Sequence, residues 1–532
     1  MREIIYVQAG TLANYTGTHF WNTQESYLFD TTIEKSLVDL HDPEVSFREG
    51  LTQTGQPTLC PRLLVFDRKA NFGTLAKTNA LLGTNEDDVS DEEVAAIWNG
   101  GVAEYRQDPI QKSTYHSSLD DSDRTENSTA DGANKPQIGP ENVRYWSDFN
   151  RVYYVPRTVQ KIPDAPEWEN PDGDWNSGQE MFSRYNEDTD LMEGSLRLFL
   201  EECNSIQGIQ VINDTASFGS FINSFLTAFR DEFVKLPCLV IPLLTDAGSR
   251  HIDVDDYQGT RNLISDALYL RGLSEFSSLS IPIQPPVTWD TESWSDYIAS
   301  GRHNTYHNSA ILSAHIETST LPLRLKGTHE SIGSISSQLD WRGGTPFGEL
   351  SGVFPFTSAE DLDNRIVNFS SGQSALRGPG PTLFARRDVS RGFSPSQITG
   401  YDTWCSRLSI QDSYVSRIHA PGYPIPTSFP SFFKAPDSNR SLHPGILTRP
   451  PKTALLSSLS TTSFTAKLFS KYATSIEKCL SRKFAVESIG SDSDELKELA
   501  NNLWTLHDNF SDDGGVDGNI GDDDGASLGE DE

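Results

Sequence analysis

MREIIYVQAGTLANYTGTHFW, residues 1–21, is the stretch of the chain that decides its fold. The run from Ile4 to Val7 consists of β-branched and aromatic residues, which predicts a short strand buried on both faces. Gly10 ends this run, and Asn14 can cap the turn that follows. A strand, a loop of small residues and a helix, in this order, are typical of the first unit of an α/β nucleotide-binding fold.

Residues 1–21 closely resemble the start of tubulins. Tubulins open with a Met-Arg-Glu-Ile strand, a Gln-Ala-Gly loop, an asparagine and a Phe-Trp pair. The matching residues here are Met1–Ile4, Gln8–Gly10, Asn14, Phe20 and Trp21. After the loop, tubulins have a glutamine and a cysteine that face the nucleotide, whereas this chain has Thr11 and Leu12. A tubulin-like start that diverges at the nucleotide resembles the Misato family, and the serine-rich spacer resembles its fungal members.

A second match to tubulins lies in the middle of the chain. GIQVIND, Gly208–Asp214, predicts a buried strand, phenylalanines spaced by four predict a helix over Phe218–Val234, and Leu236–Leu244 predicts another central strand. In tubulins a similar strand, a glycine-rich loop and a helix ending in Arg-Glu-Glu-Tyr form the nucleotide domain, and Arg230–Phe233 is similar to that ending. The resemblance implies an α/β fold with a Rossmann-type, mostly parallel sheet flanked by helices, and a second, smaller α/β domain.

The composition argues against several classes of function. The chain has 43 Lys and Arg against 75 Asp and Glu, a formal charge of −32, so no basic surface is expected for nucleic acid or anionic lipid. Five cysteines without a Cys-x-x-Cys pair predict reduced thiols rather than a zinc site or a disulfide framework. No run approaches the roughly eighteen apolar residues of a transmembrane helix. An N-terminal strand is also unlike a secretory signal or an amphipathic presequence.

Changes in composition along the chain predict its domain organisation. Residues 113–142 are rich in Ser, Asp and Asn, which predicts a disordered linker. Residues 511–532 hold nine acidic residues and no Lys or Arg, which predicts a disordered acidic tail. The predicted units are a Misato- or tubulin-like segment (1–112), the linker (113–142), the continuation of the tubulin-like core (143–330), a second α/β domain with long loops (331–457), C-terminal helices (458–510) and the tail (511–532).

Local patterns add further predictions. The predicted strands are Leu63–Phe66, Val152–Val155 and Thr158–Ile162, and the predicted helices are Ser90–Tyr105, Thr461–Phe484 and Ser493–Phe510. Ser309–Leu325 predicts a helix followed by an apolar strand. Asp164–Glu180 predicts an acidic loop, whose tryptophans Trp168 and Trp175 could bind a partner or pack on the body of the protein.

The segment at the place of the tubulin phosphate loop lacks the glycines of that loop. Tubulins cradle phosphates with Gly-Gly-Gly-Thr-Gly-Ser-Gly, whose backbone N–H groups can approach the anion. The register set by Arg230 places Asn213–Gly219, NDTASFG, at this loop, with Gly219 as its glycine. Asp214 would add a negative charge near a phosphate, and Phe218 would fill space that must stay open. The remaining candidates for a degenerate nucleotide loop are Gly10, Asn14, Thr215, Ser217 and Gly219.

No pattern for catalysis or metal binding stands out. The chain has no Walker-type Gly-Lys-Ser/Thr, no Gly-x-Ser-x-Gly, and no Asn-x-Asp-x-x-Glu of the kind with which tubulin-like GTPases act on a neighbour's nucleotide. His303 and His307 could share a metal on a helix, but no third ligand stands at a usual spacing, so surface or core histidines are the better interpretation. We therefore expect no catalytic residues, no metal and no cofactor, with bound GTP as the less favoured alternative.

The resemblance to the Misato family implies a function in partitioning mitochondria and mitochondrial DNA at division. The first hypothesis is a non-catalytic, tubulin-related protein that binds protein partners, at the cytosolic face of mitochondria with a cytoplasmic pool. The second is a divergent GTP-binding protein. The third is a cofactor of tubulin or of a chaperonin that handles tubulin.

Overall fold

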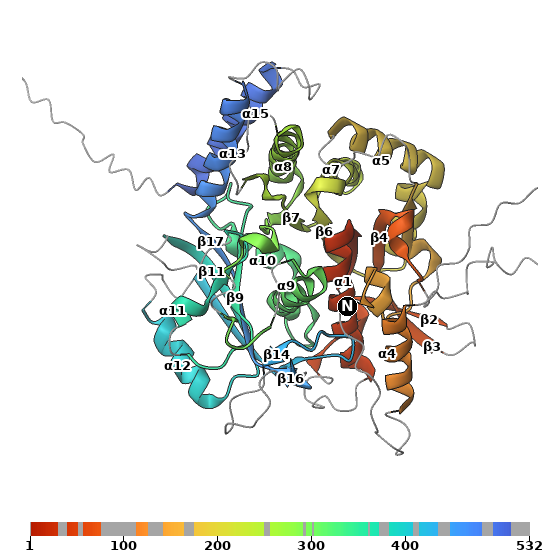
Figure 1. The fold of residues 1–532 in the computed structure, drawn as a ribbon. Coiled ribbons are helices and arrows are strands. Elements are labelled where there is room, and N and C mark those ends of the chain that lie inside the picture. Colours follow the sequence, from red (N-terminus) through yellow and green to blue (C-terminus); the bar gives the residue numbers. More distant parts are fainter. Residues whose placement is uncertain are drawn as a thin grey trace, which may run out of the picture.

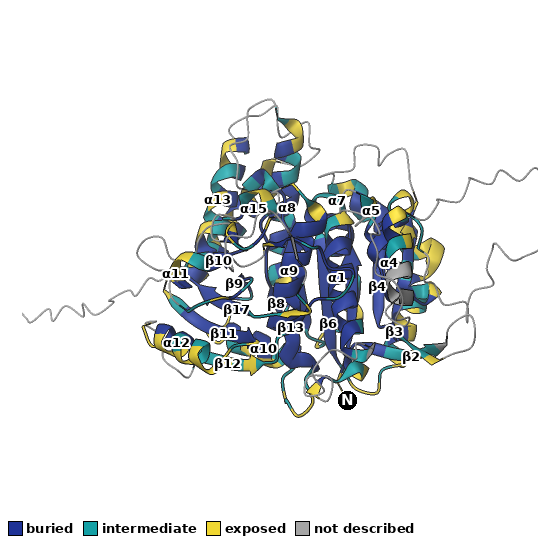
Figure 2. Ribbon diagram, turned by 60° about the horizontal axis from the view of Figure 1, so that its bottom comes forward, coloured by how far each residue is buried: buried dark blue, intermediate teal, exposed yellow. Residues whose placement is uncertain are grey.

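The computed structural model describes residues 2–29, 40–51, 57–75, 113–125, 142–163, 175–248, 256–290, 294–299, 303–359, 362–371, 382–407, 414–434, 447–448, 450–480 and 493–511. Two large β-sheets, three two-stranded sheets and the helices around them make up the described chain (Figure 1). Most strands of the two large sheets are buried, the edge strand Val415–Ala420 is not, and the other exposed residues lie mainly on the outer helices (Figure 2).

The first sheet has six parallel strands in the order β5-β4-β1-β6-β7-β8. The strands are β1 (Glu3–Ala9), β4 (Leu63–Arg68), β5 (Val159–Ile162), β6 (Ile206–Asp214), β7 (Cys238–Leu243) and β8 (Leu279–Ser280). Successive residues of β1 point to opposite faces: Ile4 and Tyr6 join one core, and Ile5 and Val7 join the other. The apolar run at the N-terminus is therefore a central strand buried on both faces, as predicted.

Each face of the first sheet is covered by a different set of helices (Figure 1). One face carries α1 (Thr11–Phe29), α9 (Thr305–Thr320) and α10 (Ile332–Leu339). The other carries α5 (Trp175–Thr189), the π-helical segment Leu191–Leu196 with α6 (Arg197–Glu201), α7 (Thr215–Glu232) and α8 (Tyr257–Phe276). The C-terminal hairpin, α13 (Thr465–Leu480) and α15 (Ser493–Phe510), packs on α8. The prediction of a parallel sheet flanked by helices is confirmed.

A mixed five-stranded sheet forms the second α/β unit, in the order β10-β9-β17-β11-β12. Its elements are β9 (Glu349–Val353), β10 (Val367–Asn368), β11 (Leu383–Arg391), β12 (Val415–Ala420), β17 (Leu455–Thr462), α11 (Leu362–Arg365) and α12 (Pro395–Cys405). β12 runs parallel to β11, and the other pairs are antiparallel. Helix α9 contacts both α1 and this sheet, so the two units share one core.

Short elements complete the described chain. They are the hairpin β2 (Phe47–Leu51) and β3 (Pro57–Pro61), the pairs β13 (Tyr423–Pro424) with β16 (Lys452–Thr453) and β14 (Phe433–Lys434) with β15 (Leu447–Thr448), and helix α4 (Thr114–Thr125). All five cysteines are free thiols, four of them buried. Among the described residues, no helix has both the length and the apolarity needed to span a bilayer.

Several sequence-based boundaries need correction. The predicted linker 113–142 begins with a helix, α4, whose Tyr115 and Leu119 are buried in the core. The predicted unit boundary at 457 is also wrong, because it cuts β17, a central strand of the second sheet. Long-range packing, which local composition does not reveal, decides both regions.

Three local predictions also differ from the structure. Val152–Val155 forms no strand, since Pro156 begins a 3₁₀ turn, and the strand nearby is β5. The apolar strand expected after α9 is a 3₁₀ turn, Leu321–Arg324, because Pro322 cannot donate to a ladder. Trp175 starts α5 instead of lying in a loop.

Some predictions fall on residues that the structure leaves undescribed. These are the helix Ser90–Tyr105, Trp168, and the tail beyond Ser511, all of which lie outside the described residues.

Candidate functional site

A cleft of about 530 Å³ opens at the carboxyl ends of β1, β4, β6 and β7. β1 has β4 on one side and β6 on the other, so the cleft lies where the strand order changes direction. Ligands of open α/β sheets bind at such a switch point. The lining residues are Thr11, Leu12, Asp67, Arg68, Asn71, Asp214, Ala216, Ser217, Phe218, Leu243, Leu244, Thr245, Asp246, Asn262, Pro285 and Val287.

The carboxylate of Asp214 occupies the N-terminus of α1. Its Oδ2 accepts a hydrogen bond from the backbone N–H of Leu12, and its Oδ1 accepts one from Ala13, each at 2.8 Å. These N–H groups belong to the first helical turn, which has no acceptors of its own and carries the positive end of the helix dipole. Asp214 stands directly before α7 but makes no side-chain cap bond to it. The place of α1 that suits an external anion is thus held by a carboxylate of the chain itself.

Gly10 makes room for this carboxylate. Its φ of +101° lies in the region that favours glycine, and a Cβ there would come within 2.6 Å of Asp214 Oδ2. Gly10, which tubulins also have, therefore allows the end of β6 to approach the start of α1 closely in this chain.

Asn14 lies behind the cleft rather than in it. Its Nδ2 donates to the carbonyl of Phe66 at 3.0 Å and to Asp67 Oδ2 at 2.9 Å, and the side chain is buried. Asp67 also accepts from Asn71 at 2.8 Å and from Trp146 Nε1 at 3.1 Å. Burial raises the pKa of Asp67 above its usual range, against the effect of these donors. Asn14 thus holds the end of β4 in place.

Thr215 and Ser217 belong to the first turn of α7, and Gly219 to the second. The Oγ1 of Thr215 donates to buried Asp266, whereas Ser217 is half-buried and faces the cleft. A Cβ on Gly219 would meet Thr215 Cβ at 3.7 Å, an ordinary contact. The segment 213–219 is therefore a direct junction between a strand and a helix, without an open glycine loop.

The expectation that Phe218 blocks the cleft is wrong. Phe218 borders the cleft, but its ring is buried in the core, 5.7 Å from the ring of Phe221. Its place in the helix directs the side chain towards the apolar side of α7, where phenylalanines spaced by four pack on the sheet.

Among the described residues that line the cleft, negative groups outnumber positive ones. Asp67, Asp214 and Asp246 line it, with Arg68 as the cation among its lining residues. Two unit charges of the same sign about 4 Å apart repel by about 4 kcal/mol near a protein surface. The arrangement therefore disfavours a polyphosphate and suits neutral or cationic groups better.

Comparison with known proteins agrees with this fold. The Misato Segment II tubulin-like domain matches residues 2–121, and a tubulin domain matches residues 135–325. Protein DML1 of Gibberella zeae is 35% identical over 69% of this chain and 70% of its own length. The chain belongs to the Misato family. Protein dml-1 of Neurospora crassa is 27% identical over 97% of this Misato-family chain and 99% of its own length. Protein misato homolog 1 of Danio rerio is 25% identical over 70% of this chain and 67% of its own.

The two histidines considered for a metal do not form a pair in this Misato-family protein. His307 lies inside α9, buried 5.3 Å from the ring of Phe432, whereas His303 is exposed before the helix. Burial lowers the pKa of His307 to about 4. Within the described chain, no three His, Cys, Asp or Glu side chains are placed to hold a metal ion.

Trp175 is half-buried against the core beneath α5. It also borders a small hollow of about 330 Å³ between α5, α8 and α15. Packing on the body of the protein, one of the two alternatives for this tryptophan, is what the structure shows.

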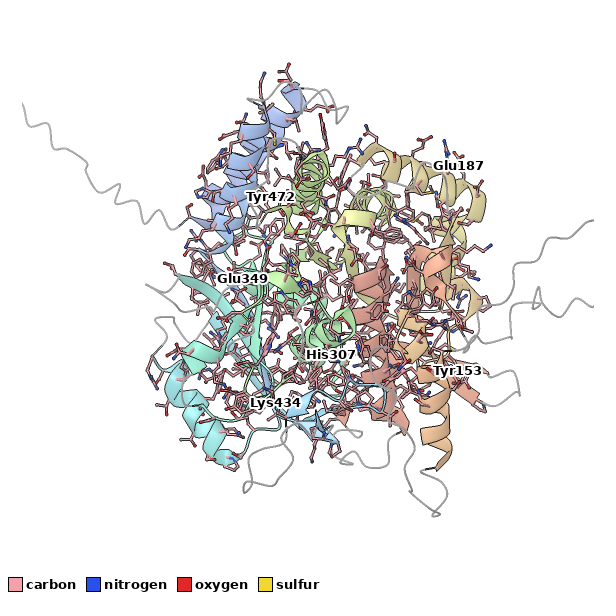
Figure 3. All side chains as sticks on the ribbon, in the orientation of Figure 1. Tyr153, Glu187, His307, Glu349, Lys434 and Tyr472 are labelled. Carbon is pink, nitrogen blue, oxygen red and sulfur yellow. The ribbon has the colours of Figure 1, made fainter. Side chains whose placement is uncertain are left out.

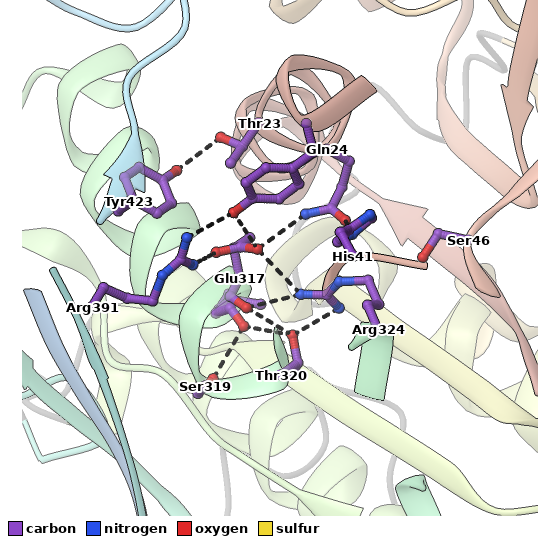
Figure 4. A network of polar contacts seen from close by, with 12 residues as sticks. Thr23, Gln24, His41, Ser46, Glu317, Ser319, Thr320, Arg324, Arg391 and Tyr423 are labelled. Carbon is purple, nitrogen blue, oxygen red and sulfur yellow. Dashed lines mark hydrogen bonds and ion pairs between the residues drawn. The ribbon is translucent and has the colours of Figure 1, made fainter. Parts of the chain in front are cut away.

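Sequence reasoning missed two buried polar clusters. One surrounds Asp266 of α8, and the other surrounds Glu317 of α9 (Figure 4). A single acidic residue within an apolar stretch, as in LISDALYL around Asp266, was a usable signal, because a buried charge needs partners. The identity of those partners depends on tertiary contacts.

Proposed function

We propose that this chain is a non-catalytic, tubulin-related protein that acts in the partitioning of mitochondria and mitochondrial DNA by binding protein partners. The observation that carries the non-catalytic part is the carboxylate of Asp214 on the N-terminus of α1. The mitochondrial part is supported by the resemblance to the Misato family.

The physical argument concerns how a nucleotide would have to bind. Its phosphates would meet Asp214 where tubulin-like folds offer backbone N–H groups, and displacing the carboxylate would cost the hydrogen bonds from Leu12 and Ala13. The described segment 213–219, at the place of the tubulin loop, is a direct junction between β6 and α7 and offers no glycine loop with other donors. The core strands and helices persist without that loop, which favours a scaffold that acts by binding partners on its surface.

We place the protein on the cytosolic face of mitochondria, with a cytoplasmic pool. The formal charge of −32 disfavours direct adhesion to anionic lipid, so protein partners are the proposed link. Tubulin, or a chaperonin that handles tubulin, is a candidate partner because the chain shares the tubulin fold. Membrane fractionation with protease treatment of intact mitochondria tests this placement: the mitochondrial fraction of the protein should be degraded.

A replacement experiment in Neurospora crassa tests the function. Cells that lack their own relative are complemented with this chain or with its Ser217→Trp variant, which fills the cleft beside α7. We expect mitochondrial DNA to be lost without the protein and to be retained equally with both versions. Normal inheritance in the deleted cells would contradict the mitochondrial function. Failure of a well-folded Ser217→Trp variant would show that the cleft itself is needed.

A divergent GTP-binding protein is the second candidate. The observation in its favour is the cleft of about 530 Å³ at the position where the fold class binds ligands. The start of α7 also lacks a side-chain cap from Asp214, and Thr215 and Ser217 bear hydroxyl groups. Calorimetry with GTP and magnesium distinguishes the two candidates.

A further inference from the structure

One buried carboxylate joins three parts of the protein. Asp266 of α8 is fully buried and accepts hydrogen bonds from Thr215 Oγ1 (2.5 Å), Thr245 Oγ1 (2.6 Å), the Thr245 backbone N–H (3.2 Å) and Tyr472 Oη (2.8 Å). These donors come from the start of α7, from the loop after β7 and from α13.

Two of these partners form walls of the cleft or adjoin them. Thr215 directly follows Asp214, and its single hydroxyl proton is shared between Asp266 and the carbonyl of Leu243, whose oxygen lies 3.1 Å from Oγ1. Thr245 lines the cleft, and its Oγ1 accepts from the backbone N–H of Ala247 at 3.3 Å. Asp266 therefore fixes the position of the walls at the ends of β6 and β7.

The third partner belongs to the C-terminal hairpin. Tyr472 is buried on the side of α13 that faces α8 (Figure 3). A Cβ on Gly248, at the end of the loop 245–248, would come within 2.7 Å of the Tyr472 ring. The hairpin thus packs directly on the loop whose other end lines the cleft.

Among the described residues, Asp266 has no ion-pair partner, and the donors that reach it are all neutral. A buried carboxylate in this situation depends on each of its hydrogen bonds, because water cannot replace a lost donor. Removing Tyr472 Oη would therefore change how strongly Asp266 holds Thr215 and Thr245.

We propose that the α13–α15 hairpin regulates the cleft through Asp266. A partner that draws α13 away from α8 removes the Tyr472 bond and loosens the walls at Thr215 and Thr245. Any ligand that orders those walls stabilises the docked hairpin in return, because coupling between two sites is reciprocal. This regulation concerns the cleft itself and does not depend on the mitochondrial function.

Hydrogen exchange on the full-length protein tests the coupling. In Tyr472→Phe we expect exchange to rise roughly fivefold in segments 214–218 and 243–248, as for the loss of one buried hydrogen bond. Tyr401→Phe is the matched control, because Tyr401 Oη donates to buried Asp388 at 2.5 Å in the second unit. It should affect β11 and α12 and leave the cleft segments unchanged.

The reverse direction uses Thr245→Val, which removes the hydroxyl and keeps the branched shape. We expect faster exchange in α13 for this variant and restored protection in Thr245→Ser. Exchange that rises in α13 alone for Tyr472→Phe, or in neither region, would overturn the proposal. A hairpin unaffected by Thr245→Val would also overturn it, because coupling through Asp266 must act in both directions.

Discussion

Two buried carboxylates, Glu317 and Asp266, have hydrogen-bond partners of different kinds in this fold. Glu317 of α9 accepts from Arg391 Nη1 at 3.0 Å and lies 3.5 Å from Arg324 Nη2 (Figure 4). It also accepts from Tyr27 Oη at 2.9 Å, so it ties α1 and β11 to α9. Asp266 has neutral donors only in the described chain, and burial raises its pKa to about 6.

This difference gives the two clusters different roles: we call the cluster around Glu317 the rigid joint and the cluster around Asp266 the adjustable joint. The charge of Glu317 is compensated by two guanidinium groups at the boundary between the two sheets, where a fixed orientation is needed. The charge of Asp266 is held by hydroxyl groups and one backbone N–H beside the cleft, so its free energy changes when any one of them moves. The fold thus has a rigid joint between its two units and an adjustable one between cleft and hairpin.

The largest expected effect comes from breaking the rigid joint. Arg391→Met should lower the free energy of unfolding by about 3–5 kcal/mol, because Glu317 loses a charged partner inside the core. Urea denaturation followed by circular dichroism measures this loss. Arg197→Met, which removes exposed ion pairs to Glu193 and Glu201, should shift the midpoint far less. Equal shifts for the two variants would contradict the structural role of the joint.

A pH profile tests the adjustable joint. The folded protein keeps a proton on Asp266 up to about pH 6, whereas the unfolded chain loses it near the ordinary pKa of 3.8. This group therefore lowers stability as pH rises through that window, by at most about 1.4 kcal/mol per pH unit. The Asp266→Asn variant lacks this term, so its stability relative to the native chain should increase from pH 4 to pH 6. Tyr472, Asp246 and the two threonines are the polar groups near the site. If the difference in the free energy of unfolding between the two proteins does not change with pH, the pKa of Asp266 is not raised in the folded state.

The smallest expected effect concerns the start of α7. Gly219→Ala should raise the free energy of unfolding by about 0.5–1 kcal/mol, because alanine favours the helix and its Cβ meets ordinary contacts. Thermal unfolding of the two proteins measures the change. Destabilisation would mean that Gly219 serves an open loop, as in tubulins, rather than a regular helix.

Strongly patterned segments could be predicted from the sequence. The N-terminal strand, Gly208–Asp214 and Leu236–Leu244 became β1, β6 and β7, and Ser493–Phe510 was recovered with its bounds as α15. The second unit was poorly predicted because its central strand, β17, reaches its partners β9 and β11 only after long excursions of the chain.

The candidate site was predictable in its place but not in its bonds. The charge of Asp214 at the former phosphate loop was visible in the sequence. Its bonds to Leu12 and Ala13 follow from the pairing of β1 with β6, which brings residues two hundred positions apart together. The same holds for Asn14, whose partner Asp67 comes from β4.

Calorimetric titration of the purified full-length protein with GTP and magnesium tests the central claim most directly, namely that Asp214 has taken the anion position of the cleft. We predict no binding heat up to millimolar GTP. A dissociation constant in the micromolar range or below would contradict the claim and restore the nucleotide-binding alternative.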